Sequence, residues 1–259
     1  MTENKNIVYR PGSDRGLLDL ITPAGPGPFP VVVCIHGGGW QDGTKEIIRD
    51  YAPFLVNASI AALLPNYRLT VTHPHPAQEE DLFAVLDWIA DNARAHRLDA
   101  QRIGLTGASA GAHLAALVGL KAARRAGARY AVRCILPVCG ISDVSLWLKQ
   151  KPQYRQDVEA LLGGPAEERG AVARDCSPLF NVHAGAPPCL AVHGDADDVV
   201  PLSQSTLFTE ALCKAGVAAE AIIVPGADHT AFMPGTKPRE PLGGANAFEG
   251  FFKKYLLNA

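Results

Sequence analysis

The sequence lacks an excess of charge of either sign. Its 24 lysine and arginine residues and 26 acidic residues leave a formal net charge of -2. A strongly basic chain would point to nucleic acid or to an anionic membrane surface, and this balance predicts neither partner.

Long apolar runs are also missing. No run approaches the length that a helix needs to cross a bilayer, so we expect no membrane association. Residues 1–5 are polar and lack the apolar segment of a secretory signal, which favours a cytoplasmic location. Nothing in the sequence specifies the oligomeric state, and a homodimer is one candidate.

Paired metal-binding and disulfide motifs are absent as well. The cysteines show no CxxC pairing, and free cysteine in an apolar run behaves as a small hydrophobic residue. We therefore expect reduced thiols and no zinc site. His73 and His75, in the sequence His-Pro-His-Pro, are interpreted as part of a turn rather than as metal ligands. The six cysteines are Cys34, Cys134, Cys139, Cys176, Cys189 and Cys213.

The chain does contain short β-rich runs that alternate with longer helical patterns. This alternation predicts an α/β fold, with a mostly parallel sheet and helices on both faces. The length of 259 residues, 47% of them apolar, suits a single domain spanning residues 1–259. Residues 142–185 contain no clean strand and are expected to form a small inserted cap.

The expected strands and helices can be placed from their apolar patterns. Residues 31–35 are apolar throughout and predict a central strand buried on both faces. Pro137 counts against ladder pairing near the end of the strand expected at 131–139. Other strands are expected at 60–64, 102–106, 188–193 and 219–224, and helices at 77–95, 110–123, 203–215 and 242–257.

The strongest motif is GASAG at residues 107–111, between an expected strand and an expected helix. A serine hydroxyl becomes an effective nucleophile only when a base removes its proton, and it must be exposed where a carbonyl can approach. A tight strand-to-helix turn meets that need, and side chains on Gly107 or Gly111 would collide with neighbouring backbone. Ser109 is therefore the candidate nucleophile, in preference to a structural serine in a small-residue turn.

A second glycine-rich segment, HGGGW at residues 36–40, follows the first buried strand. Successive glycines leave the backbone free to aim amide groups at the negative oxygen of a tetrahedral intermediate. We expect Gly38 and Gly39 to supply these amides, together with Ala110 at the start of a helix. His36 is then expected to orient the loop, and a simple glycine hinge is the alternative.

A histidine in the loop after the last expected strand is the candidate base. His229 follows Asp228 there and can reach Ser109 across the edge of the sheet. His193, at a strand end, and His113, one turn beyond Ser109, are interpreted as packed histidines.

The loop at residues 193–201, HGDADDVVP, supplies the candidate acid. Asp197 is our choice to orient His229, because it lies within the loop and close to the turn into the next helix. Asp195 or Asp198 could instead cap that turn or helix, and Asp143 is a more distant rival. The order Ser109, Asp197, His229 is the order expected of this architecture.

Taken together, these motifs resemble those of the hormone-sensitive-lipase-like esterases, and within them the compact bacterial branch that includes feruloyl- and acetylxylan-esterase-like proteins. The similar segments run from about residue 31 to the C-terminus in the family's order. The resemblance implies the α/β-hydrolase fold, with Ser109 as nucleophile, His229 as general base and Asp197 as orienting acid. It implies the same oxyanion donors, Gly38, Gly39 and Ala110. The similar segments are 36–40, 66–69, 107–114, 193–201 and 228–229.

Two departures concern the acyl pocket. The larger lipase-like members have a longer N-terminal helical cap, whereas only a short segment precedes the first core strand here. Residues 70–72, Thr-Val-Thr, stand where Ala-Pro-Glu is usual. A partly apolar pocket is expected to include Trp40, Trp147 and Phe232, and a plain core role for them is an equal alternative.

The predicted activity is hydrolysis of short- to medium-chain or aromatic carboxylic esters through an acyl-enzyme, with no metal or cofactor. Its predicted small-molecule partner is an ester. An arylformamidase or another amidase with the same triad is the main alternative. A catalytically silent binding relative is less favoured, because Ser109, Asp197 and His229 are all present.

Overall fold

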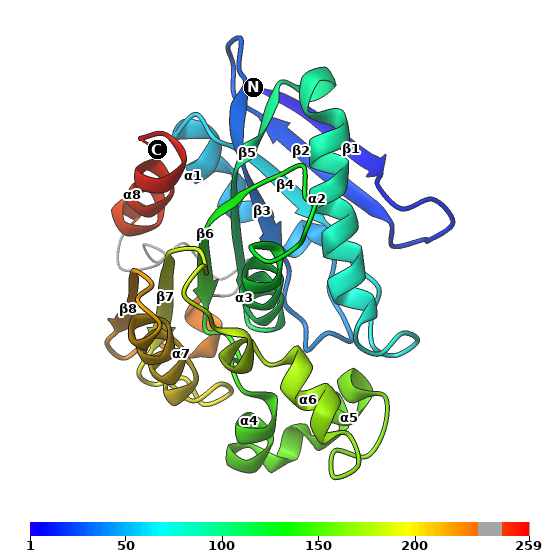
Figure 1. Cartoon of the computed structure of the whole chain (residues 1–259), viewed down its shortest axis with the longest axis vertical. Coiled ribbons are helices and arrows are strands. Elements are labelled where there is room, and N and C mark those ends of the chain that lie inside the picture. The colour runs from blue at the N-terminus through cyan, green and yellow to red at the C-terminus, as the bar shows by residue number, and fades with distance from the viewer. Residues whose placement is uncertain (233–244, 259) are drawn as a thin grey trace.

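An eight-stranded sheet forms the centre of the molecule (Figure 1). The computed structural model describes residues 1–232 and 245–258. The strand order is β1-β2-β4-β3-β5-β6-β7-β8, and the pairs β1–β2 and β2–β4 are antiparallel whereas the others are parallel. The expected mostly parallel sheet is confirmed. The strands are β1 (Thr2–Val8), β2 (Leu17–Thr22), β3 (Phe29–Ile35), β4 (Ala61–Pro65), β5 (Leu98–Ala108), β6 (Val132–Val138), β7 (Cys189–Gly194) and β8 (Ala219–Val224).

Helices cover both faces of this sheet. The helices α2 (Ala77–His96), α3 (Ala110–Ala122) and α7 (Ser203–Lys214) contribute to one apolar layer, and α1 (Ala52–Asn57) and α8 (Ala245–Leu256) to the other. Successive residues of β3 alternate between the two layers, with Val31 and Val33 in the first and Val32 and Cys34 in the second. All of β3 is buried, which explains why its sequence is apolar throughout.

A group of short helices separates β6 from β7. In Figure 1 the helices α4, α5 and α6 lie together beyond the lower end of the sheet. Segment 142–185, which was expected to form a cap, contains these helices and no strand, and all of it is described. The helices of this segment are α4 (Val144–Gln150), η2 (Pro152–Tyr154), α5 (Arg155–Leu162), α6 (Gly170–Cys176) and η3 (Pro178–Asn181), where η denotes a short 3-10 helix. Outside the segment, the 3-10 helix η1 (Lys45–Tyr51) follows β3 and η4 (His229–Phe232) follows β8.

The two N-terminal strands were not predicted. β1 lies at the edge of the sheet and exposes mostly polar side chains, so it has no apolar pattern. β2 is buried, but Asp19 interrupts its apolar run. The Asp19 carboxylate pairs with Lys45 Nζ at 2.9 Å and Arg49 Nη1 at 3.2 Å, and these contacts compensate for its burial.

Strand β6 continues through Pro137 despite the expected interruption. Pro137 pairs with Gly107 of β5. On the other side of β6, the amide of Ile135 donates to Pro188 O and that of Cys139 to Val192 O. Pro137 lies between these two donors and has no N–H, so β6 loses one hydrogen bond to β7 while it keeps its pairing with β5.

None of the helices in the described part of the chain is both long enough and apolar enough to cross a membrane.

Candidate active site

Ser109 alone forms the turn between β5 and α3. β5 ends at Ala108 and α3 begins at Ala110. The φ of Ser109 is 56°, in the left-handed region that residues other than glycine rarely adopt. Its amide donates to the carbonyl of Val138 at 2.9 Å, which ties the strained turn to β6.

The two glycines of the motif allow the backbone of β3, β5 and α3 to approach closely. A Cβ atom on Gly111 would lie 2.1 Å from the carbonyl oxygen of Ile35 and 2.5 Å from that of His36. A Cβ on Gly107 would lie 2.6 Å from the Gly111 backbone. The expected collision with neighbouring backbone is confirmed, and it explains why the turn requires glycine on both sides of Ser109.

This close approach predicts a large effect of one methyl group on stability. Gly111→Ala should lower the free energy of unfolding by about 3 kcal/mol or more, because backbone atoms must move to admit the Cβ. Urea unfolding followed by circular dichroism measures the change. Gly250→Ala is the matched control: its Cβ would enter open space on α8, so it should stabilise the protein by roughly 0.5–1 kcal/mol. Equal stability of the two variants would contradict the packing described here.

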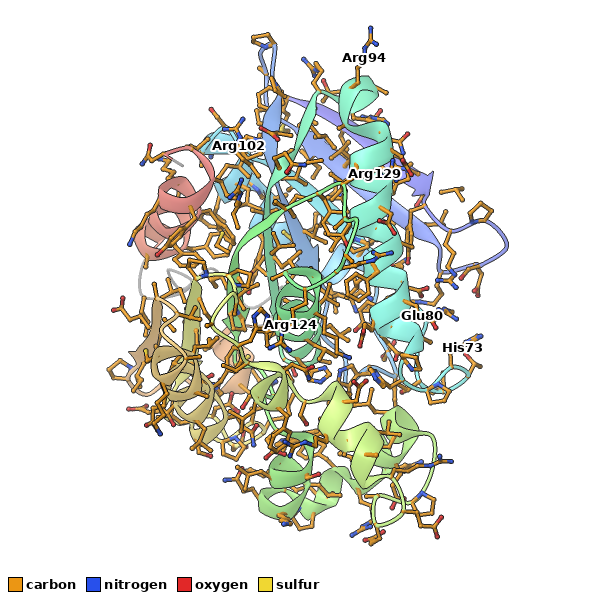
Figure 2. All side chains as sticks on the ribbon, viewed as in Figure 1. His73, Glu80, Arg94, Arg102, Arg124 and Arg129 are labelled. Carbon is orange, nitrogen blue, oxygen red and sulfur yellow. The ribbon has the colours of Figure 1, made fainter. Side chains whose placement is uncertain are left out.

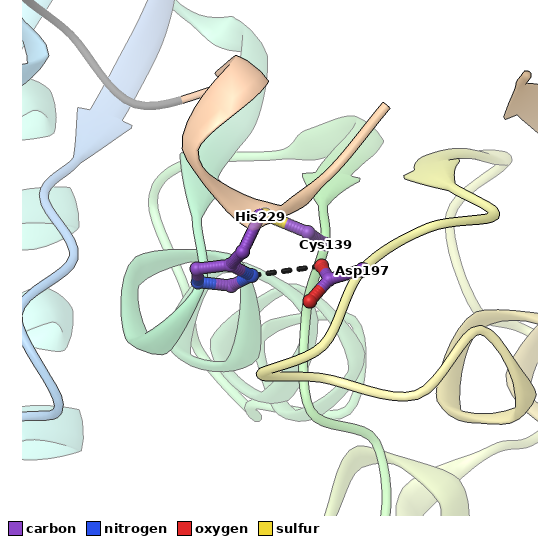
Figure 3. A group of neighbouring side chains, drawn as sticks. All are labelled: Cys139, Asp197 and His229. Atoms are coloured by element: carbon purple, nitrogen blue, oxygen red, sulfur yellow. Dashed lines mark hydrogen bonds and ion pairs between the residues drawn. The ribbon is translucent and has the colours of Figure 1, made fainter. Parts of the chain in front are cut away.

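The structure brings Ser109, Asp197 and His229 together. The Ser109 Oγ lies 3.1 Å from His229 Nε2. His229 Nδ1 lies 2.7 Å from Asp197 Oδ2, the contact drawn as a dashed line in Figure 3. An ionised carboxylate can only accept hydrogen bonds, so His229 Nδ1 carries the proton and Nε2 is left to accept from Ser109. This is the arrangement in which a histidine can remove the serine proton.

Hydrogen bonds hold Asp197 in its ionised form. Its Oδ1 accepts from the amides of Val199 and Val200, at 2.9 and 2.8 Å. Burial works against ionisation, but hydrogen bonds from His193, His229 and the Val200 amide outweigh it and hold the Asp197 pKa well below its usual value. The contact with His193, at 3.3 Å, was not anticipated. The expected packing of His193 is otherwise observed, with partners at both ring nitrogens.

The rival acids have other partners. Asp195 Oδ1 accepts from the amide of Gly226 and so joins the two loops. Asp143 Oδ1 accepts from the amide of Leu146 and caps α4. Asp198 is exposed, and its carbonyl accepts from the Lys151 ammonium. Among the four candidates, Asp197 is the one hydrogen-bonded to His229.

The glycine-rich loop after β3 lies beside Ser109. Gly38 and Gly39 have positive φ values of 109° and 57°, and both line the same pocket as Ala110 and Ser109. His36 supports the loop. Its Nδ1 is 2.7 Å from Gly37 O, and its ring stacks on that of Tyr67 with a centroid distance of 4.2 Å. Burial lowers the His36 pKa to about 4, so the ring is neutral at physiological pH and suits a supporting role.

A pocket of about 360 Å³ opens beside Ser109 and His229. Trp40 and Trp147, two of the three expected pocket residues, line it. The side chain of Phe232, the third, lies outside the described part of the structure. Four further residues that were not predicted also line it: Ile141, Tyr154 and Asp157, which no motif marks, and Val199, which lies in the 193–201 loop.

Predictions were also made for His113, for His73 and for the cysteines. His113 is buried between Trp40 Nε1, which donates to it at 3.1 Å, and the carbonyl of Cys176 at 2.7 Å. His73 lies on the exposed turn before α2 (Figure 2). Five cysteines are buried and Cys213 is exposed, and all six are free.

Among the described residues, two groups of side chains have the spacing of metal ligands. Cys139 lies with Asp197 and His229 (Figure 3), but burial raises the pKa of its thiol, so a thiolate ligand is disfavoured at neutral pH. His75 lies with Glu79 and Asp175, whose carboxylates are 2.7 and 3.0 Å from the Lys121 ammonium. Lys121 therefore already supplies a positive charge at that position.

Comparisons with known proteins identify the family of the chain. The family model described as BD-FAE matches residues 18–212. Esterase LipQ of Mycobacterium tuberculosis is 29% identical over 227 residues, which cover 83% of this chain and 54% of LipQ. This chain thus spans about half the length of the curated relatives it matches.

Solved structures share the fold over nearly the whole chain. A truncated carbohydrate esterase from gut microbiota superimposes with a TM-score of 0.83 at 23% identity, covering 99% of this chain and 97% of that one. The Est2 esterase of Thermogutta terrifontis with propionate bound gives 0.75 at 25% identity, covering 98% and 93%. The α/β-hydrolase fold that the sequence predicted is confirmed.

Proposed function

The chain belongs to the BD-FAE family, and from that membership together with the site geometry we propose that it is a serine carboxylesterase. The observation that carries the proposal is the continuous hydrogen-bonded series from Asp197 through His229 to Ser109, at the wall of a pocket. Such a series activates a serine for attack on a carbonyl.

In the proposed reaction His229 removes the Ser109 proton as Oγ attacks the ester carbonyl. The amides of Gly38, Gly39 and Ala110 stabilise the negative oxygen of the tetrahedral intermediate. His229 then gives its proton to the leaving alcohol, and the acyl group stays on Ser109. A water molecule, deprotonated by His229, attacks this acyl-enzyme and releases the acid, so no metal or cofactor is required.

The size and lining of the pocket favour small acyl groups or alcohols. A volume of about 360 Å³ lies near the lower end for small-molecule sites. Helices α4 and α5, in the proposed cap at residues 142–185, supply Trp147 and Asp157 to its wall. The Est2 relative carries propionate in one structure and butyrate in another. Short-chain carboxylic esters, aromatic ones included, are therefore the proposed substrates.

The amidase alternative uses the same triad but is not favoured, because the matched relatives are named esterases and carboxylesterases. The purified protein should hydrolyse p-nitrophenyl acetate and its butyrate, with much slower turnover of the matching anilides. It should also be labelled covalently by a fluorophosphonate probe, which reports an activated serine. Faster turnover of the anilide would favour the amidase. Failure both to label and to hydrolyse would refute the proposed activity.

A further inference from the structure

One carboxylate in the pocket has no role in the proposed reaction. Asp157, on α5, lines the pocket that contains Ser109 and His229. Its Oδ1 accepts a hydrogen bond of 2.5 Å from Gln41 Nε2. The same oxygen lies beside the glycine-rich loop, since a Cβ on Gly39 would be 3.5 Å away from it. Asp157 is thus held in place next to the proposed oxyanion donors.

Among the described residues, no lysine or arginine pairs with this carboxylate. Among the described residues that line the pocket, none is lysine or arginine. Two cations of the same region are engaged elsewhere: the Lys151 ammonium donates to the carbonyl of Asp198, and Arg155 pairs with Glu159 and Glu167. Within residues 1–232 and 245–258, Asp157 forms no ion pair of its own. Within the described part of the chain, the pocket lining therefore contains a carboxylate that no lysine or arginine neutralises.

The charge of Asp157 affects the pKa of the neighbouring Tyr154. Burial raises the pKa of Tyr154, and the carboxylates of Asp198, Asp157 and Asp197 raise it further. Burial also raises the pKa of Asp157, although the hydrogen bond from Gln41 works in the opposite direction. Tyr154 thus lies in a negative electrostatic potential on the wall of the pocket.

Three aromatic residues, Trp40, Trp147 and Tyr154, also line the pocket. Tyr154 stacks on Trp147 with a centroid distance of 5.0 Å, and Trp147 meets Trp40 edge to face at 5.8 Å. Both indole N–H groups are already engaged, that of Trp40 with His113 and that of Trp147 with the carbonyl of Val199. Both indoles are almost fully buried and offer no donors, whereas Tyr154 is only partly buried and is the aromatic ring most accessible from the pocket. Ring faces and a carboxylate both attract cations.

We propose that Asp157 is a specificity-determining residue, which makes the pocket prefer esters that carry a positively charged alkylammonium group over uncharged esters of the same shape. The inference rests on the proposed esterase function and extends it to a class of substrate. A neutral polyol ester is the competing occupant, but the wall offers it few side-chain donors: both indole N–H groups are occupied, which leaves the Tyr154 hydroxyl.

Matched pairs of esters test this preference. In each pair one ester carries a trimethylammonium group and its partner carries a tert-butyl group of nearly the same shape. One pair bears the group on the alcohol of an acetate ester, the other on the acyl chain of an ethyl ester. In at least one pair the wild-type protein should favour the charged ester, and Asp157→Asn should lower the charged-to-neutral ratio of kcat/KM about tenfold. Asp157→Ser, which also removes the charge, should act in the same direction.

Glu168→Gln is the control. Glu168 is exposed and does not line the pocket, but its substitution removes the same charge from the same group of helices. It should leave both ratios unchanged. Unchanged ratios in the two Asp157 variants would overturn the proposal. So would a selective loss of activity on a monoacetylated polyol, which would assign Asp157 to hydroxyl recognition. Fluorophosphonate labelling and turnover of the tert-butyl esters show separately whether the esterase activity itself exists.

Discussion

Ser109→Ala should lower kcat/KM for p-nitrophenyl acetate at least about ten-thousandfold and should abolish fluorophosphonate labelling. The expected loss is this large because the proposed acyl-enzyme cannot form without Oγ, and the oxyanion donors alone provide only a small residual rate enhancement. The measurement is initial-rate kinetics on purified protein, with the uncatalysed hydrolysis subtracted.

Stability should hardly change in the same variant. Alanine at this position keeps a Cβ and the same φ of 56°, so the strain in the turn is retained, and one hydrogen bond of 3.1 Å is lost. Ser145→Ala provides the comparison, since Ser145 is exposed on α4, and it should keep both labelling and turnover. Substantial activity in Ser109→Ala with normal unfolding would move the nucleophile to another residue.

The second large effect is expected at the acid. Asp197→Asn should lower kcat about a thousandfold to ten-thousandfold, because an amide N–H facing His229 Nδ1 would favour the tautomer with its proton on Nε2. A protonated Nε2 cannot accept the proton of Ser109. The asparagine amide would face His229 Nδ1 in this way because Asp197 Oδ2 lies 2.7 Å from that nitrogen.

The neighbouring acids supply the controls for this variant. Asp195→Asn removes the charge from an exposed loop contact with Gly226, and Asp198→Asn from an exposed side chain. Each should change kcat less than about threefold, since neither is hydrogen-bonded to His229. If Asp195→Asn or Asp198→Asn were more damaging than Asp197→Asn, the orienting role would belong to that residue instead.

The pH dependence of stability should also differ between these variants. The Asp197 pKa is lower in the folded protein than in the unfolded chain, so its ionisation stabilises the fold above the unfolded value near 4. That contribution is lost as the pH falls below this value toward the folded pKa. Asp197→Asn lacks this acid-dependent contribution, whereas Asp198→Asn should retain it.

The central strands could be predicted because their residues are buried on two faces. Residues 31–35 are apolar for that reason, and β3 contains all of them. The GASAG turn could be recognised because close backbone contacts permit only glycine at residues 107 and 111. Both features depend on the burial or packing of nearby backbone, and such requirements leave clear marks in the sequence.

Other parts of the molecule left no such mark. β1 is an edge strand whose mostly exposed polar residues are compatible with many conformations. Asp157 and Tyr154 reach the pocket only through the packing of α5 and η2, and nothing near them in sequence distinguishes them from surface residues. The contact between His193 and Asp197 joins a strand end to a loop four residues later, and its geometry depends on the path of that loop.

The helices between β6 and β7 supply Trp147, Tyr154 and Asp157 to the pocket, but they contribute none of the three side chains that would break the ester bond. This division separates two kinds of evolutionary change. Insertions or exchanges within residues 144–181 could change which esters enter the pocket without altering the proposed catalytic residues Ser109, Asp197 and His229. Relatives with the same central strands can thus differ in substrate while they keep the same reaction.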